Sequence, residues 1–239
     1  MLKSIKQICG DKLGASDGEI GHVKDFYFDD KRWVIRYLVA DTGNWLTGRQ
    51  VLISPHAFKS LYQPGKVLIV NLTRKEIESS PSIDTHKPVS RQYEEEYYQY
   101  YGWPSYWDGD GIWGMGGFPV VSANSIPYAG TGAAKRSDKA EHSDPHLRSA
   151  QAVIGYQIQA GEETVGSVTD FLVDDQSWVI GQLVVNTGSR FTGKKVLLRP
   201  GAIDRISYEE SKVFVNVTKD AILHLPVFDE HPKAAAVAH

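Results

Sequence analysis

The feature that most restricts the fold of this chain is an internal duplication. Residues 4–81 match residues 149–226 without a gap when the chain is shifted by about 145 positions. Roughly a third of the aligned positions are identical, and most others keep their apolar or polar character. The period is much longer than that of a solenoid repeat, so each copy is expected to be a domain of its own.

Each copy has the sequence pattern of a small β domain. In the first copy, residues 19–28 and 33–40 are rich in β-branched and aromatic side chains and flank a polar turn, which predicts a hairpin. Residues 51–53 and 66–70 are expected to be further short strands. Thr73 and Glu76 fit the capping box of a short helix. Short strands at close spacing favour a small closed barrel, because closure removes exposed strand edges.

The duplication sets the expected domain limits. We predict a mainly β protein with a first barrel over residues 1–81 and a second over residues 149–228, each folding separately. Residues 229–239 are expected to form a disordered tail. Residues 82–148 are expected to be a linker that contains a short helix near residues 90–101, with Ser90 as its N-cap.

Aromatic residues are concentrated in this linker, followed by glycine-rich and then flexible sequence. A large exposed apolar cluster is unusual, so these side chains should pack on a barrel or on a partner. We favour internal packing of the helix face that carries Tyr93, Tyr97, Tyr100 and Tyr101, with Trp107 and Trp113 more exposed. The alternative is a docking surface, whose candidate residues are Tyr97, Tyr101, Trp103, Trp107 and Trp113.

One motif resembles half of an aspartic protease site. Asp41-Thr42-Gly43 follows an apolar run, but the second copy has Asn186 where the second carboxylate would be required. We therefore interpret both sites as turns that end a strand, in which Asp or Asn binds the local backbone and Gly adopts positive φ. The predicted turn residues are Asp41, Gly43, Asn186 and Gly188.

The remaining polar residues do not form a pattern for catalysis or ligand binding. The acidic pairs at residues 29–30 and 174–175 are interpreted as solvated turn acids, and His142 and His146 lie in sequence expected to be flexible. A phosphate-binding loop and a nucleophile elbow are both absent from the sequence. We predict no catalytic residues, no metal site and no cofactor. The lone cysteine, Cys9, is expected to be a small buried hydrophobe.

Charge and hydropathy restrict the cellular setting. The formal net charge is -3, which argues against a dedicated nucleic-acid binder. A single cysteine fits a reducing compartment, and no run approaches the ~20 apolar residues of a membrane helix. These features predict a cytoplasmic protein and leave peripheral attachment to a membrane complex open.

Taken together, the motifs of both copies resemble the PRC-barrel domain. The resemblance rests on residues 17–21, 25–30, 33–39, 41–46 and 49–55, and on residues 166–171, 178–184 and 195–200. Residues 97–104 are similar to the tail of stand-alone bacterial members. The same domain forms the cytoplasmic part of the photosynthetic reaction-centre H subunit and half of a ribosome maturation factor. The resemblance thus implies two PRC-type barrels.

Fold does not determine function, so three hypotheses follow from the sequence. The first is a non-catalytic adaptor that docks on a protein partner, for example an electron-transfer or reaction-centre-type complex. The second is an assembly factor for ribosomes or RNA processing. The third is a small-molecule-binding protein or enzyme with a pocket between the barrels. We favour the adaptor because of the aromatic linker.

Overall fold

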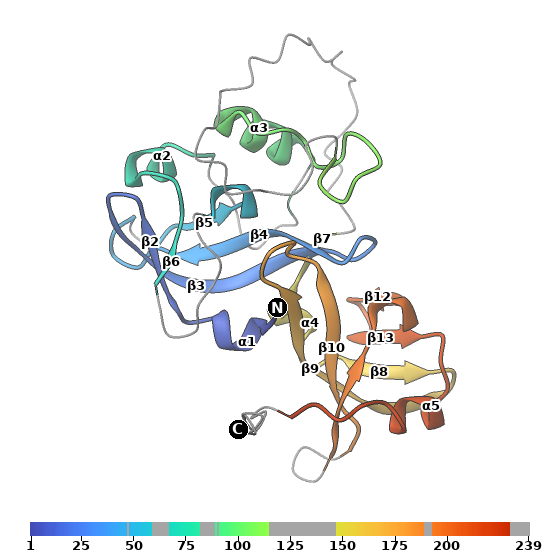
Figure 1. The fold of residues 1–239 in the computed structure, drawn as a ribbon. Helices are drawn as coiled ribbons and strands as arrows, with labels where there is room; N and C mark the ends of the chain where they lie inside the picture. Colours follow the sequence, from blue (N-terminus) through green and yellow to red (C-terminus); the bar gives the residue numbers. More distant parts are fainter. Residues whose placement is uncertain are drawn as a thin grey trace, which may run out of the picture. The chain divides into compact units, whose positions relative to one another are not determined.

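A computed structural model describes residues 1–46, 48–58, 67–81, 89, 91–114, 147–188 and 193–229. The predicted mainly β fold class is confirmed, because strands form two sheet bodies with few helices (Figure 1). The chain divides into two compact units. The first contains Met1–Gln151 and Val173–Ile180, and the second contains Ala152–Leu172 and Gly181–His239.

The strands of the first repeat follow the order β5-β4-β3-β2-β6. The predicted hairpin is confirmed, since β3 (Gly18–Asp29) pairs in antiparallel with β4 (Val34–Asp41). The flanking strands β2 (Lys12–Ala15) and β5 (Gln50–Ile53) are also antiparallel to their neighbours. The short strand β6 (Leu68–Ile69) pairs in parallel with β2.

Short helices complete the first repeat. The 3-10 helix η1 (Pro55–Ala57) leads from β5 to Phe58, which bridges Val70 beside β6 and so links the two ends of the sheet. The helix α2 (Arg74–Glu78) begins at Thr73, whose backbone N–H donates to the Glu76 carboxylate at 2.7 Å. The predicted capping box is therefore present. In Figure 1, α1 (Ile5–Ile8) and the green helix α3 (Arg91–Tyr101) lie on opposite sides of the first sheet.

The second repeat follows the same plan, with strand order β11-β10-β9-β8-β13-β12. Its strand β8 pairs in antiparallel with β9 and in parallel with β13, as β2 pairs with β3 and β6 in the first repeat. The strands are β8 (Gln157–Ala160), β9 (Glu163–Asp174), β10 (Ile180–Asn186), β11 (Lys195–Leu198), β12 (Ile203–Ser207) and β13 (Lys212–Val215). The helices are α4 (Ala150–Val153), η3 (Pro200–Ala202) and α5 (Lys219–Leu223).

The turn after β4 has the geometry of a local cap. The Asp41 carboxylate accepts a hydrogen bond from the Gly43 N–H at 2.9 Å, and Gly43 has a φ of +52°. Asn186 ends β10 at the matching position, and Gly188 follows it. Gly21 in β3 lies so close to this turn that a Cβ there would collide with the Asp41 carbonyl oxygen.

The first unit contains parts of both repeats. The strand β7 (Leu147–Ser149) pairs with the end of β3, and β1 (Leu2–Ser4) pairs with β9. The hairpin tip Val173–Ile180 also belongs to this unit. The compact units therefore do not follow the limits expected from the duplication. Those limits, at residues 81 and 149, stay a prediction.

Several expected segments fall outside the described residues. These are Ser90, the sequence from residue 121 to residue 146 with His142 and His146, and the tail beyond Asp229. Of the expected linker, residues 91–114 belong to the first compact unit, where α3 occupies the helix position predicted from the sequence.

Candidate interaction surface

The helix α3 packs on β4 and β5 of the first repeat. Tyr97 is fully buried, its hydroxyl donates to the Leu52 carbonyl at 3.1 Å, and it accepts from the Ser54 N–H at 2.9 Å. Its ring meets that of Tyr37 edge-on, with 5.5 Å between the centroids. Hydrogen bonds to strand backbone hold α3 in one register on the sheet.

The buried face of α3 differs from the expected one. Tyr98 is 1% exposed, whereas Tyr100, which we placed on the buried face, is 42% exposed. The aromatic spacing placed Tyr93, Tyr97, Tyr100 and Tyr101 together, but the packing is centred on the adjacent pair Tyr97 and Tyr98. The reason is that Tyr98 fits against Tyr37 and His56 of the first repeat, at centroid distances of 6.4 and 6.1 Å.

The expectation that Trp113 is exposed is wrong. Its side chain is 1% exposed, and its indole N–H donates to the Ser177 carbonyl at 3.2 Å. Tyr97 and Trp113 were candidates for a docking surface, but neither reaches the surface. The other three candidates, Tyr101, Trp103 and Trp107, are half-buried.

A buried carboxylate ties α3 to the strand β4. Glu94 is fully buried, and its Oε1 accepts from the hydroxyls of Tyr37 and Tyr106 at 2.7 and 2.6 Å. Burial, together with the Glu94 charge, raises the pKa of Tyr37 well above its usual value. Tyr37 therefore remains a hydrogen-bond donor, and the carboxylate serves to position the segment after α3.

A buried guanidinium holds the next part of the same segment. Arg36 on β4 is fully buried, and it donates to Asp29 at 3.2 Å and to the Ile112 carbonyl at 2.7 Å. Its guanidinium lies 4.0 Å from the centre of the Tyr106 ring and 4.9 Å from that of Trp113. The charge is compensated by an ion pair, a carbonyl and two ring faces.

His56 lies among aromatic rings at the edge of this cluster. Its ring centroid is 5.7 Å from that of Trp103 and 5.3 Å from that of Trp113. Burial, with a smaller contribution from the Arg36 charge, lowers the pKa of His56 to about 4. The imidazole is therefore neutral at pH 7.

This histidine should make stability depend on pH. In the unfolded chain the His56 side chain takes up a proton near pH 6.5, but in the folded chain it does so only near pH 4. The contribution of neutral His56 to the free energy of unfolding should therefore be fully present above pH 6.5. As the pH falls towards 4, this contribution should decrease by on the order of 2 kcal/mol. Urea unfolding of the native protein and of His56→Phe, from pH 4 to 8, should show a flatter profile for the variant. Parallel profiles would contradict this assignment.

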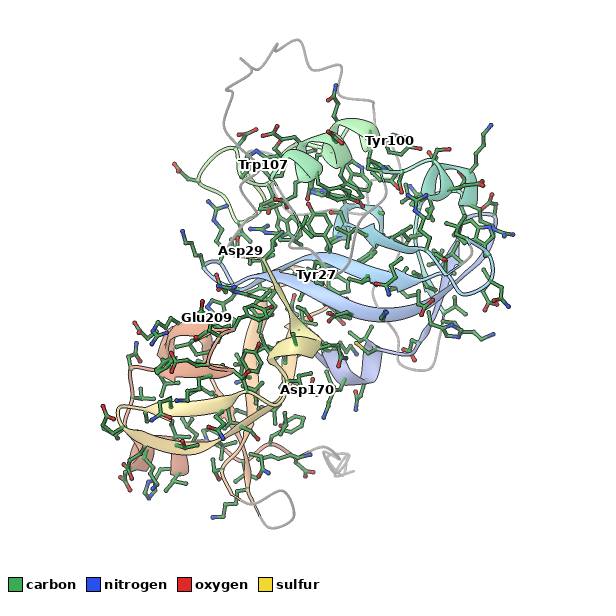
Figure 2. The ribbon with its side chains drawn as sticks, turned by 180° about the vertical axis from the view of Figure 1, so that it is seen from behind. Tyr27, Asp29, Tyr100, Trp107, Asp170 and Glu209 are labelled. Carbon is green, nitrogen blue, oxygen red and sulfur yellow. The ribbon has the colours of Figure 1, made fainter. Side chains whose placement is uncertain are left out.

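A surface pocket of about 380 Å³ lies beside the cluster. Tyr101 and Trp103 stack at its wall, with 4.5 Å between centroids and an angle of 12°. The Tyr100 hydroxyl donates to the Glu76 carbonyl at 2.9 Å and so ties α3 to α2. Figure 2 shows Tyr100 on α3 and Trp107 on the segment that follows. The pocket is lined by His56, Ala57, Asn71, Leu72, Glu76, Tyr100, Tyr101 and Trp103.

A signal for this arrangement is present in the sequence. The residues of the first repeat that receive α3 and the following segment are polar or aromatic, and their counterparts in the second repeat are not suited to the task. The receiving residues are Arg36, Tyr37, Ser54 and His56, and the counterparts are Gly181, Gln182, Arg199 and Gly201. Comparing the two copies for differences would have predicted which of them binds the aromatic segment.

Other residues singled out from the sequence have structural roles. Cys9 is half-buried, although we expected it to be buried. Asp29 accepts from the N–H groups of Lys31 and Arg32 at 2.9 and 3.0 Å, as expected of a turn acid, but it is buried and not solvated as we expected, because it pairs with Arg36. Among the described residues, no group of three or more His, Cys, Asp or Glu side chains could hold a metal ion. Within the same residues, no helix is long and apolar enough to cross a membrane.

Comparison with known families agrees with this architecture. Residues 4–78 match the family model described as PRC-barrel domain. The first repeat is a PRC-barrel domain. The second repeat has the matching strand order and shares the duplicated motifs, so the chain has the features of a tandem PRC-barrel protein. A search of curated proteins found no match.

Proposed function

We propose that this tandem PRC-barrel protein is a non-catalytic adaptor in the cytoplasm. It binds a protein partner through the aromatic surface formed by Tyr100, Tyr101, Trp103 and Trp107. The proposal rests on one observation: Tyr100, Tyr101 and Trp103 line a surface pocket beside a helix that buried hydrogen bonds hold in place. Tyrosine and tryptophan are favoured anchors of protein interfaces, and a rigid scaffold lowers the entropy cost of binding.

The polar residues next to this surface support binding rather than proton-transfer chemistry. Arg36 is paired with Asp29, and the Glu94 carboxylate accepts from two tyrosine hydroxyls. These interactions hold α3 and the following segment in place. The charged groups therefore serve to present the aromatic rings at the surface.

The partner that we propose is an electron-transfer or reaction-centre-type complex, bound at the membrane periphery. This assignment extends the family resemblance and needs a direct test. The full chain, carrying an affinity tag, should be recovered from its native cells at moderate salt and its bound proteins identified. Recovery of ribosomal proteins instead would favour the assembly-factor alternative.

The surface itself can be tested with paired variants. Tyr100→Ala and Trp103→Ala should each lower partner recovery about tenfold or more, because anchor residues contribute ~2 kcal/mol or more to binding. Tyr100→Ala should lower the melting temperature only slightly, because the side chain is exposed and its hydrogen bond to the Glu76 carbonyl is in contact with solvent. Trp103→Ala should lower it by a few degrees, because Trp103 stacks on Tyr101.

A matched control is Tyr208→Ala, which removes an exposed tyrosine from the second repeat. This variant should keep full recovery of the partner. If Tyr100→Ala and Trp103→Ala also keep full recovery, the aromatic surface is not the docking site.

A further inference from the structure

Equivalent residues of the two repeats contact each other within the first unit. Val34 and Val179 occupy the same position of the two copies, and they form an antiparallel bridge. The backbone bonds on either side are related by exchange of the repeats. They run from the Ile35 N–H to the Trp178 carbonyl at 2.9 Å and from the Ile180 N–H to the Trp33 carbonyl at 2.7 Å.

The first strands of the repeats are exchanged in the same reciprocal way. The residues of β7 align with those of β1 at the same shift of 145 positions, so the duplication extends two residues further than residue 4. β7 pairs with β3 of the first repeat, and β1 pairs with β9 of the second. Matching ion pairs accompany the strands. Arg148 Nε lies 2.7 Å from the Asp30 carboxylate, and at the equivalent positions Lys3 Nζ lies 3.9 Å from the Asp175 carboxylate.

A tryptophan anchors the exchanged hairpin. Trp178 is buried against Phe58 and Phe26, with centroid distances of 4.6 and 6.1 Å. It has a φ of +58°, a conformation that is uncommon for a bulky residue and that the surrounding structure must maintain. Trp33 has a φ of +54° after the same type of acidic turn. The backbone conformation is therefore shared, but the packing is not symmetric, because Trp33 is half-buried and stacks on Phe28 of its own repeat with 5.6 Å between the centroids.

The two hydrogen bonds that flank the Val34–Val179 bridge, the pairings of β1 and β7, and the two ion pairs are each related by exchange of the repeats, as in an isologous, self-complementary interface. We propose that this surface, formed by the tryptophan hairpin and the strands β1 and β7, recognises a second copy of the first repeat when the second repeat of the same chain does not cover it. It differs from the aromatic surface proposed above for the protein partner. Its test is therefore independent of the adaptor proposal.

The first experiment asks whether recognition needs the covalent connection. A cleavage sequence for a specific protease replaces residues 126–132 in the full chain, and the purified protein is cut. We expect the two pieces to elute together in gel filtration as a 1:1 complex, because both contribute strands and side chains to the first unit. Separate elution of the folded pieces would overturn the proposal.

The second experiment asks whether the surface pairs with a copy of itself. The bridge between Val34 and Val179 is a non-hydrogen-bonded pair, for which a Cα separation of about 4.5 Å suits a disulfide. In a Cys9→Ser background, the cut Val34→Cys protein is unfolded in urea, refolded by dilution and oxidised. We expect a fraction of the first piece to form disulfide-linked homodimers joined at position 34, because refolding lets this piece pair either with the second piece or with another copy of itself.

Three controls make the result specific. The uncut Val34→Cys protein should give no dimer, because Val179 covers the position. The uncut Val34→Cys/Val179→Cys protein should form a disulfide within a monomer, and this shows that the geometry and the fold persist. Ser79→Cys, an exposed position on the same piece, reports random collision. The proposal is contradicted if the cut Val34→Cys protein forms no more homodimer than the Ser79→Cys protein while the double variant still forms its internal disulfide. That result would show that the surface does not pair with a copy of itself.

Discussion

A chain that ends at Ser90 should lack a cooperative unfolding transition, although it contains the complete first repeat. The full chain covers that repeat with Tyr97, Tyr98, Trp113 and Trp178, all of which are buried. Each buried aromatic side chain contributes about 1.5–3 kcal/mol, and the whole stability of a typical domain is only about 5–15 kcal/mol. Thermal circular dichroism and urea titration of the 1–90 fragment should therefore show a broad, weak transition.

A longer fragment provides the control. The fragment 1–114 regains α3 and Trp113, so it should unfold more cooperatively than 1–90, yet it should be less stable than the full chain because Trp178 and β7 are missing. If the fragment 1–90 is as stable as the full chain, the first repeat is an independent domain, as the duplication alone predicts.

Arg36→Ala should be among the most damaging single substitutions in the chain. The change leaves the Asp29 carboxylate without its buried partner and the Ile112 carbonyl without a donor. Breaking a buried ion pair from one side costs about 3–5 kcal/mol. Urea unfolding at pH 7 should show this loss, and the near-ultraviolet spectrum should report the release of Tyr106 and Trp113, over which the guanidinium lies.

Arg32→Ala is the matched control for Arg36→Ala. Arg32 donates to the carbonyls of Tyr106 and Gly111, both at 3.2 Å, but it forms these bonds at a partly exposed site. Its removal should cost only about 1–2 kcal/mol. The double variant Arg36→Met/Asp29→Asn removes both charges and should recover part of the loss. Equal costs for Arg36→Ala and Arg32→Ala would show that burial of the ion pair is not what holds the segment.

The elements that the sequence predicted well depend on neighbours along the chain. The hairpin of β3 and β4 follows from alternating side chains and a polar turn, and the capping box of α2 follows from Thr73 and Glu76, three residues apart. The helix α3 was recognised by its spacing and by the glycine and proline after it. Such signals are local, so the same short stretch of sequence indicates both the type of element and where it begins and ends.

Which residues of the candidate surface are buried depends on residues far away in the chain. The spacing of tyrosines predicted that α3 has an aromatic face, but the tertiary structure decided that Tyr98 is buried and Tyr100 exposed, because Tyr37 and His56 receive one and not the other. Trp113 is buried by residues of β4 and by the Val173–Ile180 tip.

The duplication was evident from the sequence alone, and with it the fold class and the PRC-barrel resemblance. What only the tertiary structure decided is that β1, β7 and the Trp178 hairpin cross from one repeat to the other. Both copies contain the same strands, so the local pattern is satisfied whether a strand pairs within its own repeat or with the other. The choice between the two pairings depends on side-chain packing and hydrogen bonds between residues more than 100 positions apart, such as the ion pair of Arg148 with Asp30.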